Sequence, residues 1–252
     1  MSADFFVTAA IVTYNDANRA PITVESILKH TKKYPLKLYV IDNASGDDTV
    51  ACIEKSGQAI IIKNENNIGF GAAHNVILKH EIGKYHFVIN PDITLSSDVI
   101  SDMVDFFENN PDVVMAMPKI LNEDGTEQKL PKQRPTFKKL FFGRFSNKIR
   151  SEYVWADKVI TKPCEIDFCT GCFFCIRGDV FKKLLGFDER YFMYLEDADL
   201  TLKAKEKGKV MMLPQFSVMH AWERESSKSL KYLIIHIVSC FKFLIKWRGK
   251  HK

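Results

Sequence analysis

The chain has 252 residues, of which 46% are hydrophobic and 27% are charged, and this composition fits one large globular α/β domain or such a domain with a small appendage. Its first residues lack a basic region followed by an apolar one, and no stretch of about 18 uncharged apolar residues could cross a bilayer. We therefore expect no secretory signal and no membrane span, and a location on the cytoplasmic side of the membrane.

The formal net charge of +5 is unevenly distributed along the chain. Residues 129–150 carry eight Lys or Arg and no acid, and residues 224–252 carry eight Lys or Arg against one Glu, so these stretches have charges of +8 and +7 and the remainder has −10. Basic charge confined to two segments indicates a local anionic partner, such as a membrane surface, a pyrophosphate or a nucleic acid. The alternative is two solvated basic surfaces.

Strands alternate with helices in the first part of the chain. Apolar runs predict strands over residues 6–12, 36–41, 59–62 and 85–89, and helical spacing predicts helices over 21–33, 49–55 and 72–80. This alternation is typical of a parallel, doubly wound α/β sheet.

Polar residues follow each of these strands. They are Asn15, Asp42, residues 67–71 and Asp92. The carboxyl ends of parallel strands share one edge of the sheet, so four such clusters predict a single nucleotide-type pocket there. Gly69 and Gly71 would let the backbone approach a ligand, although a turn with positive φ explains them equally well. Taken alone, Asp92 could also cap a helix that begins near residues 96–98.

The second half of the chain carries the two basic segments. Residues 122–165 lack clear periodicity, and within them Phe137, residues 140–142 and Phe145 alternate with Lys and Arg, a pattern that suits anionic lipid and also stacking on nucleic acid. Residues 230–247 have apolar residues at helical spacing, with Lys231, Lys242 and Lys246 on another face. This pattern favours a basic amphipathic helix at a membrane surface; the alternative is a helix that packs on the domain with its lysines in water.

Three cysteines recur at intervals of three, at positions 169, 172 and 175. Residues 166–176 look extended, and in a strand Cys172 would point away from Cys169 and Cys175, so the three thiols could not converge on one metal ion. We expect buried, reduced cysteines.

Three acids crowd into four residues at the start of a predicted helix that runs to about residue 207. They are Glu196, Asp197 and Asp199. Acids favour the amino end of a helix for electrostatic reasons. The aromatic run of residues 191–194 precedes them, and burial beside apolar rings costs charged groups their solvation, which favours a functional role.

The order of these motifs resembles the inverting glycosyltransferases of family 2, which have the Rossmann-like GT-A fold, and is most similar to bacterial rhamnosyltransferases of cell-wall and surface-polysaccharide synthesis. The resemblance covers roughly residues 6–247. It rests on Val12-Thr13-Tyr14-Asn15, Ile41-Asp42-Asn43-Ala44-Ser45, Asn67-Ile68-Gly69-Phe70-Gly71, Asn90-Pro91-Asp92, Gly186-Phe187-Asp188-Glu189, Tyr194-Leu195-Glu196-Asp197-Ala198-Asp199-Leu200 and His220.

The resemblance implies a mixed, mainly parallel sheet flanked by helices. It also implies a catalytic domain over 1–227, with a nucleotide-sugar-binding half (1–118) and an acceptor and catalytic half (119–227), followed by a membrane-associating helix over 228–252. The implied nucleotide-sugar contacts are Thr13, Tyr14, Asn15, Asp42, Asn43, Ser45, Asn67, Gly69, Phe70, Gly71, Asn90 and Asp92. Asp92 and His220 would bind Mg²⁺ or Mn²⁺, although Asn90 replaces the first acid of the family's D-x-D motif.

In this resemblance Asp197 is the general base, Glu196 holds sugar hydroxyls or the acceptor, and Asp199 orients the loop. The implied donor is dTDP-rhamnose, and the implied acceptor is a saccharide on undecaprenyl diphosphate at the inner face of the plasma membrane. A UDP-galactose, UDP-glucose or UDP-N-acetylglucosamine donor stays open. So does a binder of nucleotide sugar or polynucleotide without catalysis, although the acids at 196 and 197 would repel nucleic acid, and we expect none as a partner.

Overall fold

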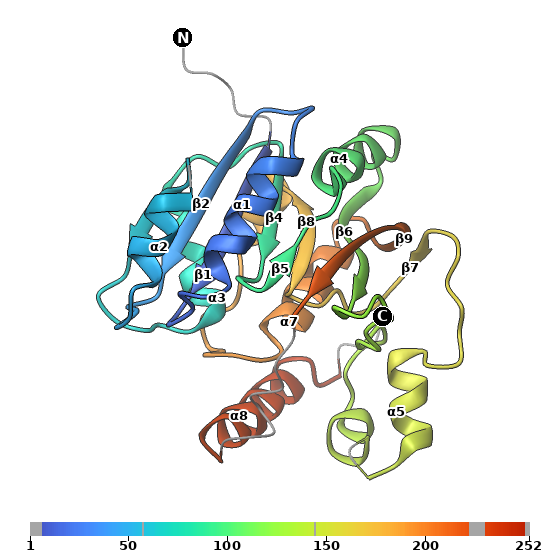
Figure 1. Cartoon of the computed structure of the whole chain (residues 1–252). Helices are drawn as coiled ribbons and strands as arrows, with labels where there is room; N and C mark the ends of the chain where they lie inside the picture. Colours follow the sequence, from blue (N-terminus) through green and yellow to red (C-terminus); the bar gives the residue numbers. More distant parts are fainter. Residues whose placement is uncertain (1–6, 57, 144, 222–229, 250–252) are drawn as a thin grey trace.

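The computed structural model describes residues 7–56, 58–143, 145–221 and 230–249. These residues form a nine-stranded mixed sheet with helices on both sides (Figure 1). The strands are β1 (Val7–Thr13), β2 (Leu36–Asp42), β3 (Ile60–Lys63), β4 (Tyr85–Ile89), β5 (Ile93–Thr94), β6 (Val113–Leu121), β7 (Cys164–Glu165), β8 (Phe173–Arg177) and β9 (Lys209–His220). The helices are α1 (Ala20–His30), α2 (Thr49–Ser56), α3 (Phe70–Asn75), α4 (Val99–Asn109), α5 (Asn147–Val154), α6 (Gly178–Lys183), α7 (Glu196–Lys205) and α8 (Leu230–Lys246).

The strand order is β3-β2-β1-β4-β8-β6-β9-β5, and β7 pairs with β9. β3, β2, β1 and β4 are parallel, which confirms the prediction for the first half of the chain. β8 then lies antiparallel to both β4 and β6, so the whole sheet is mixed. β6 spans the expected boundary between the two halves at residue 118, and it pairs with strands that come later in the chain.

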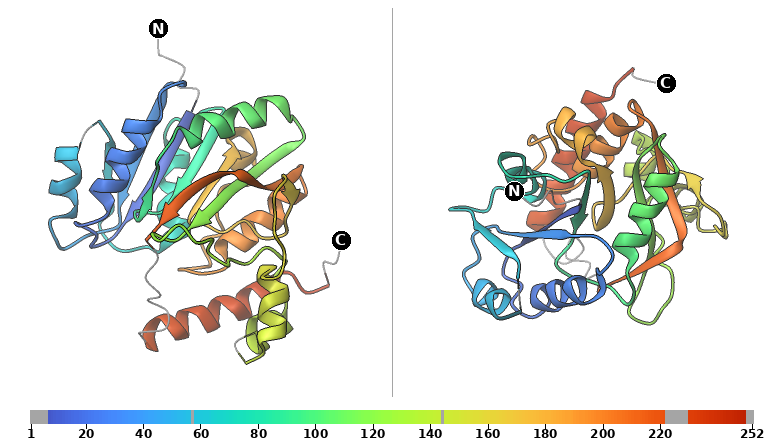
Figure 2. Two further views of the ribbon diagram at one scale, coloured as in Figure 1. Left: turned by 45° about the vertical axis from the view of Figure 1, so that its right-hand side comes forward. Right: turned by 90° about the horizontal axis from the view of Figure 1, so that it is seen from above.

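The central parallel strands are buried because helices cover both faces, whereas the edge strand β3 has no buried residue. All residues of β1 and β4 are buried, as expected for continuous apolar strands in a sheet covered on both sides. α1 and α2 cover one face, and α3 and α7 lie against the other (Figure 2). This packing leaves the ends of the strands as the place where polar loops can gather.

Three local predictions differ from the structure. The helix expected over residues 72–80 begins at Phe70 and tightens into a 3₁₀ turn over Val76–Lys79. Residues 166–172 are not a strand, because only Phe173–Arg177 pairs within the sheet, although the buried and unpaired state of the cysteines at 169, 172 and 175 is confirmed. Residues 122–165 contain a π-helical turn over Lys138–Phe142, helix α5 and strand β7.

Helix α8 lies beside α7 and away from the sheet (Figure 1). It forms a second apolar core, separate from that of the sheet, whose buried members are Phe168, Tyr191, Leu195, Ala198, Leu202, Cys240, Phe243 and Trp247. In the part of the chain that the structure describes, no helix is both long and apolar enough to cross a membrane.

Candidate active site

The loops that follow β1 and β2 are joined by hydrogen bonds. The backbone N–H of Asn15 donates to Ser45 Oγ (2.9 Å), and the N–H of Gly46 donates to Asn15 Oδ1 (2.7 Å). The Asn43 N–H donates to the Thr13 carbonyl (2.8 Å), and the Asp42 carboxylate accepts the Ser45 N–H at 3.2 Å. These contacts bring five of the predicted nucleotide-binding residues together, while Tyr14 lies beside them with nearly half of its surface exposed.

Asn43 also organises the loop that follows β3. Its side chain is buried, donates to Asn67 Oδ1 (2.9 Å) and accepts the Ile68 N–H (3.1 Å). Gly69 has φ +88°, and a Cβ on it would lie 2.2 Å from the Phe192 carbonyl oxygen. That carbonyl accepts the Phe70 N–H at 2.9 Å, so the glycine is required both by its backbone conformation and by the close approach of a second loop.

Asp92 follows β4 and faces His220, the last residue of β9. His220 Nε2 lies 3.2 Å from Asp92 Oδ1, and the Ala221 N–H donates to the Asp92 carbonyl (3.0 Å). Gln128 holds the imidazole from behind, because its amide donates to the His220 carbonyl (2.8 Å) and its Oε1 lies 3.0 Å from Nδ1. This arrangement favours a proton on Nδ1, which turns the lone pair of Nε2 toward the carboxylate.

The facing side chains of Asp92 and His220 fit a divalent metal ion. Asp92 Oδ1 and His220 Nε2 face each other at 3.2 Å, and a carboxylate oxygen together with an imidazole nitrogen is a ligand pair that divalent metal ions accept. Within the described ranges there is no group of three or more His, Cys, Asp or Glu side chains that could bind a metal ion, so protein ligands alone would leave most coordination positions to other oxygens. Diphosphate oxygens are suitable ligands for those positions.

The acids at the start of α7 lie in two different environments. Glu196 is buried, and burial raises the pKa of its carboxyl well above its usual range. Asp197 is partly exposed and accepts hydrogen bonds from the Gly171 N–H (2.8 Å) and the Ala198 N–H (2.8 Å). Burial raises the pKa of Asp197 to about 6, and the two N–H groups oppose that rise. At neutral pH Asp197 is therefore mainly ionised, while burial favours the protonated form of Glu196.

Residues Gly171 and Cys172 connect the two acidic centres, and the sequence did not single them out for this role. Gly171 donates to Asp197, and the carbonyl of Cys172 accepts the Asn90 N–H (2.8 Å). A Cβ on Gly171 would lie 3.3 Å from the Asp197 Cβ and 3.4 Å from the Phe70 ring. The Thr170-Gly171-Cys172 turn thus brings together the loop over residues 67–71, the strand end at Asn90 and the carboxylate of Asp197.

Backbone strain is concentrated around the same loops. Six non-glycine residues in the described ranges have positive φ, and four of them are Asn15 (φ 53°), Ala44 (φ 67°), Tyr194 (φ 72°) and Leu195 (φ 65°). Left-handed conformations cost non-glycine residues free energy and persist where the surrounding structure enforces them, often at functional sites.

Asp199 makes its side-chain contacts with α7 itself and with the C-terminal part of the chain. It is fully buried on the far side of α7, where Lys246 Nζ (2.7 Å) and Trp247 Nε1 (2.8 Å) of the α8 segment donate to it. Lys203 of α7 also pairs with Asp199 at 3.6 Å, and Lys246 bonds Asp188 in the loop before α7 as well, so the expectation that Asp199 orients the catalytic loop stays a prediction.

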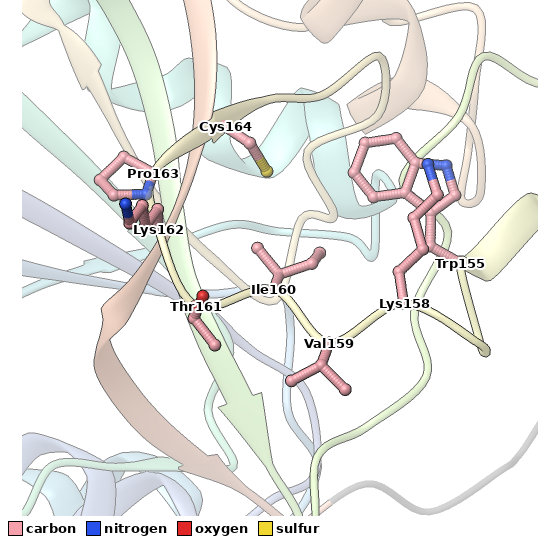
Figure 3. Close-up of a pocket in the computed structure, with 8 residues that line it drawn as sticks. All are labelled: Trp155, Lys158, Val159, Ile160, Thr161, Lys162, Pro163 and Cys164. Atoms are coloured by element: carbon pink, nitrogen blue, oxygen red, sulfur yellow. The ribbon is translucent and has the colours of Figure 1, made fainter.

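An open cleft elsewhere on the surface holds none of the predicted site residues. It is lined by Trp155 and residues 158–164, between α5 and β7 (Figure 3). The Lys158 ammonium lies 4.3 Å from the centre of the Trp155 ring.

Comparison with known proteins gives relatives among rhamnosyltransferases. Rhamnosyltransferase WbbL of Escherichia coli is 26% identical over 197 residues, covering 71% of this chain and 71% of its own. The N-acetylglucosaminyl-diphospho-decaprenol L-rhamnosyltransferase of Mycobacterium tuberculosis is 23% identical, covering 92% of this chain and 82% of its own.

Solved glycosyltransferases share the fold. The mannosyltransferase PcManGT of Pyrobaculum calidifontis, in complex with GDP-Man and Mn²⁺, superposes with a TM-score of 0.65 at 16% identity over 96% of this chain and 64% of its own. TarS of S. aureus in complex with UDP-GlcNAc superposes with a TM-score of 0.62 at 18% identity over 94% of this chain and 66% of its own. This chain therefore spans slightly less than two thirds of each solved chain, and the likeness shows the GT-A fold.

The sequence profile of Glycosyl transferase family 2 matches residues 8–185, and the chain belongs to that family.

Proposed function

We propose that this glycosyltransferase moves L-rhamnose from dTDP-rhamnose to a saccharide acceptor on a lipid diphosphate such as undecaprenyl diphosphate, in the synthesis of a cell-wall or surface polysaccharide. The observation that supports it most is the pair of acidic centres, Asp92 and Asp197, because the Gly171-Cys172 turn bonds both Asp197 and Asn90, two residues before Asp92. The names of the two relatives, both rhamnosyltransferases, support the donor sugar. The decaprenol diphosphate in the name of the mycobacterial relative supports a lipid-linked acceptor.

The strand-end loops supply the proposed donor site. The interlocked loops that contain Asn15, Asn43 and Ser45 offer amide and hydroxyl groups for a base and ribose. The loop over residues 67–71 carries Gly69 and Gly71, whose missing side chains leave backbone close to the neighbouring loop. Thr13, Tyr14, Asp42 and Asn90 complete the proposed contacts.

Asp92 and His220 are the proposed ligands for Mg²⁺ or Mn²⁺. When bound, the metal offsets the negative charge that grows on the departing diphosphate. Gln128 orients the imidazole for this task through its two contacts with His220.

Asp197 is the proposed general base. A carboxyl with a pKa of about 6 is mainly ionised at neutral pH and is close enough to that pH to take a proton efficiently from a hydroxyl. The acceptor oxygen then attacks the anomeric carbon, the bond from that carbon to the diphosphate oxygen breaks, and the configuration inverts in one displacement. Burial favours the protonated form of Glu196 beside it, and in that form Glu196 would donate a hydrogen bond to a sugar hydroxyl.

The proposed location is peripheral, at the inner face of the plasma membrane, through the basic segments 129–150 and 228–252. A lipid-linked acceptor presents its saccharide close to the headgroups, so an enzyme at the surface can reach it. The basic charge of both segments is complementary to anionic lipid.

The test is donor turnover by the intact chain with a panel of dTDP- and UDP-sugars, with Mn²⁺ or Mg²⁺ and then with a chelator. Turnover of dTDP-rhamnose alone, lost in chelator and in Asp197→Asn, is the expected result. Turnover of a UDP-sugar alone would contradict the rhamnosyl donor. Tight nucleotide binding without turnover of any donor would contradict the enzyme function itself.

A further inference from the structure

Helix α8 exposes one apolar stripe and buries other apolar residues, while Lys242 and Lys246 donate hydrogen bonds to the protein. Leu230, Ile234, Ile237, Phe241 and Ile245 recur at intervals of three and four, and all are exposed, Ile245 by 74%. A surface helix ordinarily buries such a stripe against its own domain. The spacing favoured an apolar face at a membrane surface over one packed on the domain, and in the structure α8 exposes this stripe while Cys240 and Phe243 pack against the domain.

Contacts of α8 and Trp247 with α7 and with the residues just before it fix the orientation of α8. Asp199 of α7 is fully buried and is neutralised by Lys246 at 2.6 Å, while Trp247 donates to the same carboxylate. Lys246 also pairs with Asp188 at 2.6 Å, and Ser239 donates to the Met193 carbonyl (2.7 Å). We call this group the α7–α8 tether; it holds α8 to the helix that carries the two catalytic candidates.

The basic segment over residues 129–150 extends the exposed apolar face of α8. Phe141 of the π-helical turn contacts Phe241 of α8, with ring centroids 5.6 Å apart. Phe137 and Phe142 next to it are exposed by more than half, and Phe145 is exposed by 85%. Figure 2 shows this segment and α8 on the same side of the molecule, away from the sheet.

We propose that these residues form one docking surface for an anionic lipid bilayer, with the α7–α8 tether fixing its position relative to Glu196 and Asp197. The docking surface consists of the exposed apolar residues of α8 together with Phe137, Phe142 and Phe145. Exposed basic residues accompany it, Lys138, Lys148 and Arg150 in one segment and Lys231 and Arg248 in the other. Apolar side chains ringed by lysine and arginine suit the boundary between acyl chains and anionic headgroups.

The charge selects a bilayer as the occupant over a second copy of this chain. Segments with charges of +8 and +7 would face themselves across a symmetric dimer, and like charges oppose that contact. The inference rests on the proposed function in one respect: membrane docking would bring a lipid-linked acceptor to the catalytic carboxylates. Membrane binding itself can be measured without turnover.

The experiment is co-sedimentation of the intact chain with vesicles of phosphatidylcholine containing about 30 mol% phosphatidylglycerol, and with vesicles of phosphatidylcholine alone. We expect binding to the anionic vesicles that weakens with added salt. The variants Ile234→Glu with Ile245→Glu on α8, and separately Phe145→Glu on the other segment, should each lower the partition coefficient by on the order of tenfold or more. These side chains are exposed, so the variants should melt like the wild type.

Leu185→Glu is the matched control, because Leu185 is exposed by 75% and lies outside both segments. Its binding should equal that of the wild type. Wild-type binding by both the α8 and the Phe145 variants would overturn the proposal, as would loss of binding in the control. A dimeric wild type that becomes monomeric in the α8 variant, measured by light scattering without vesicles, would instead identify an interface between copies and also overturn it. Unchanged turnover of donor in the binding-deficient variants would leave the enzyme function intact, so the two proposals fail separately.

Discussion

Replacing Asp197 with Asn and Glu196 with Gln separates the roles of two neighbouring carboxyl groups. Burial raises the pKa of Asp197 to about 6, so about nine tenths of the groups are ionised at pH 7 and about one tenth at pH 5. If the ionised form is the base, kcat should fall about tenfold for each pH unit below 6. Asp197→Asn should lower kcat by roughly 10²- to 10⁴-fold, the usual contribution of a general base.

Glu196→Gln should have a much smaller effect. Burial raises the pKa of Glu196 and so favours its protonated form, and Gln has nearly the same shape and also donates a hydrogen bond. We expect kcat within about threefold of the wild type and an acid limb that stays near pH 6.

The assay is transfer from the donor identified in the panel, measured from pH 5 to pH 8 for the wild type and both variants. Calorimetric binding of the nucleotide checks that the donor site is intact in each. The reasoning is refuted if Glu196→Gln loses as much activity as Asp197→Asn, or if the wild-type rate is flat from pH 5 to pH 7.

Three further predictions concern stability, the donor loop and the metal. Burial lowers the pKa of His86 to about 3 from an ordinary 6.5, so between pH 6.5 and pH 3 only the unfolded chain takes up this proton. The free energy of unfolding should therefore fall by about 2 kcal/mol through this residue by pH 5. Urea melts of His86→Gln should lack that part of the loss. Gly69→Ala should lower the melting temperature and weaken nucleotide binding in calorimetry, because its Cβ would meet the Phe192 carbonyl. Gly125→Ala is the control: Gly125 also has a positive φ (+81°), but no atom lies within 4 Å of the added Cβ, so nucleotide binding should stay unchanged. Gln128→Ala should raise the Mn²⁺ concentration that gives half-maximal transfer by about 10- to 100-fold. It should also weaken Mn²⁺ binding measured by electron paramagnetic resonance with nucleotide present. An unchanged Mn²⁺ requirement would show that Gln128 does not orient His220 for metal binding.

Local patterns predicted the parallel half of the sheet well. Each predicted strand was an apolar run that ended in polar turn residues, and the parallel pairing of β1, β2 and β4 brings Thr13, Asp42 and Ile89 to the same edge. This geometry follows from strand direction alone, which is why Asn15 and Asn43 could be expected near each other. The reading of residues 166–172 as a strand was wrong because apolar residues also fill a buried turn, and periodicity over so few residues does not separate the two.

Long-range partners could not be predicted. Asp199 and Lys246 are 47 residues apart in sequence, and no local pattern pairs them. Spacing in α8 indicated an apolar face and a basic face, but it could not show that part of each meets the domain, where Lys246 pairs with a buried acid on α7 and Cys240 and Phe243 pack beside it. Gly171 was missed for the same reason, since its role arises from a contact with Asp197 across the fold.

The anomeric configuration of the product, determined by NMR on the transferred sugar, tests the central claim most directly. With a single displacement assisted by Asp197, the new glycosidic bond should have the configuration opposite to that of the donor, and mass spectrometry should find no sugar covalently attached to the enzyme. A product that retains the donor configuration would contradict the mechanism argued from the two acidic centres.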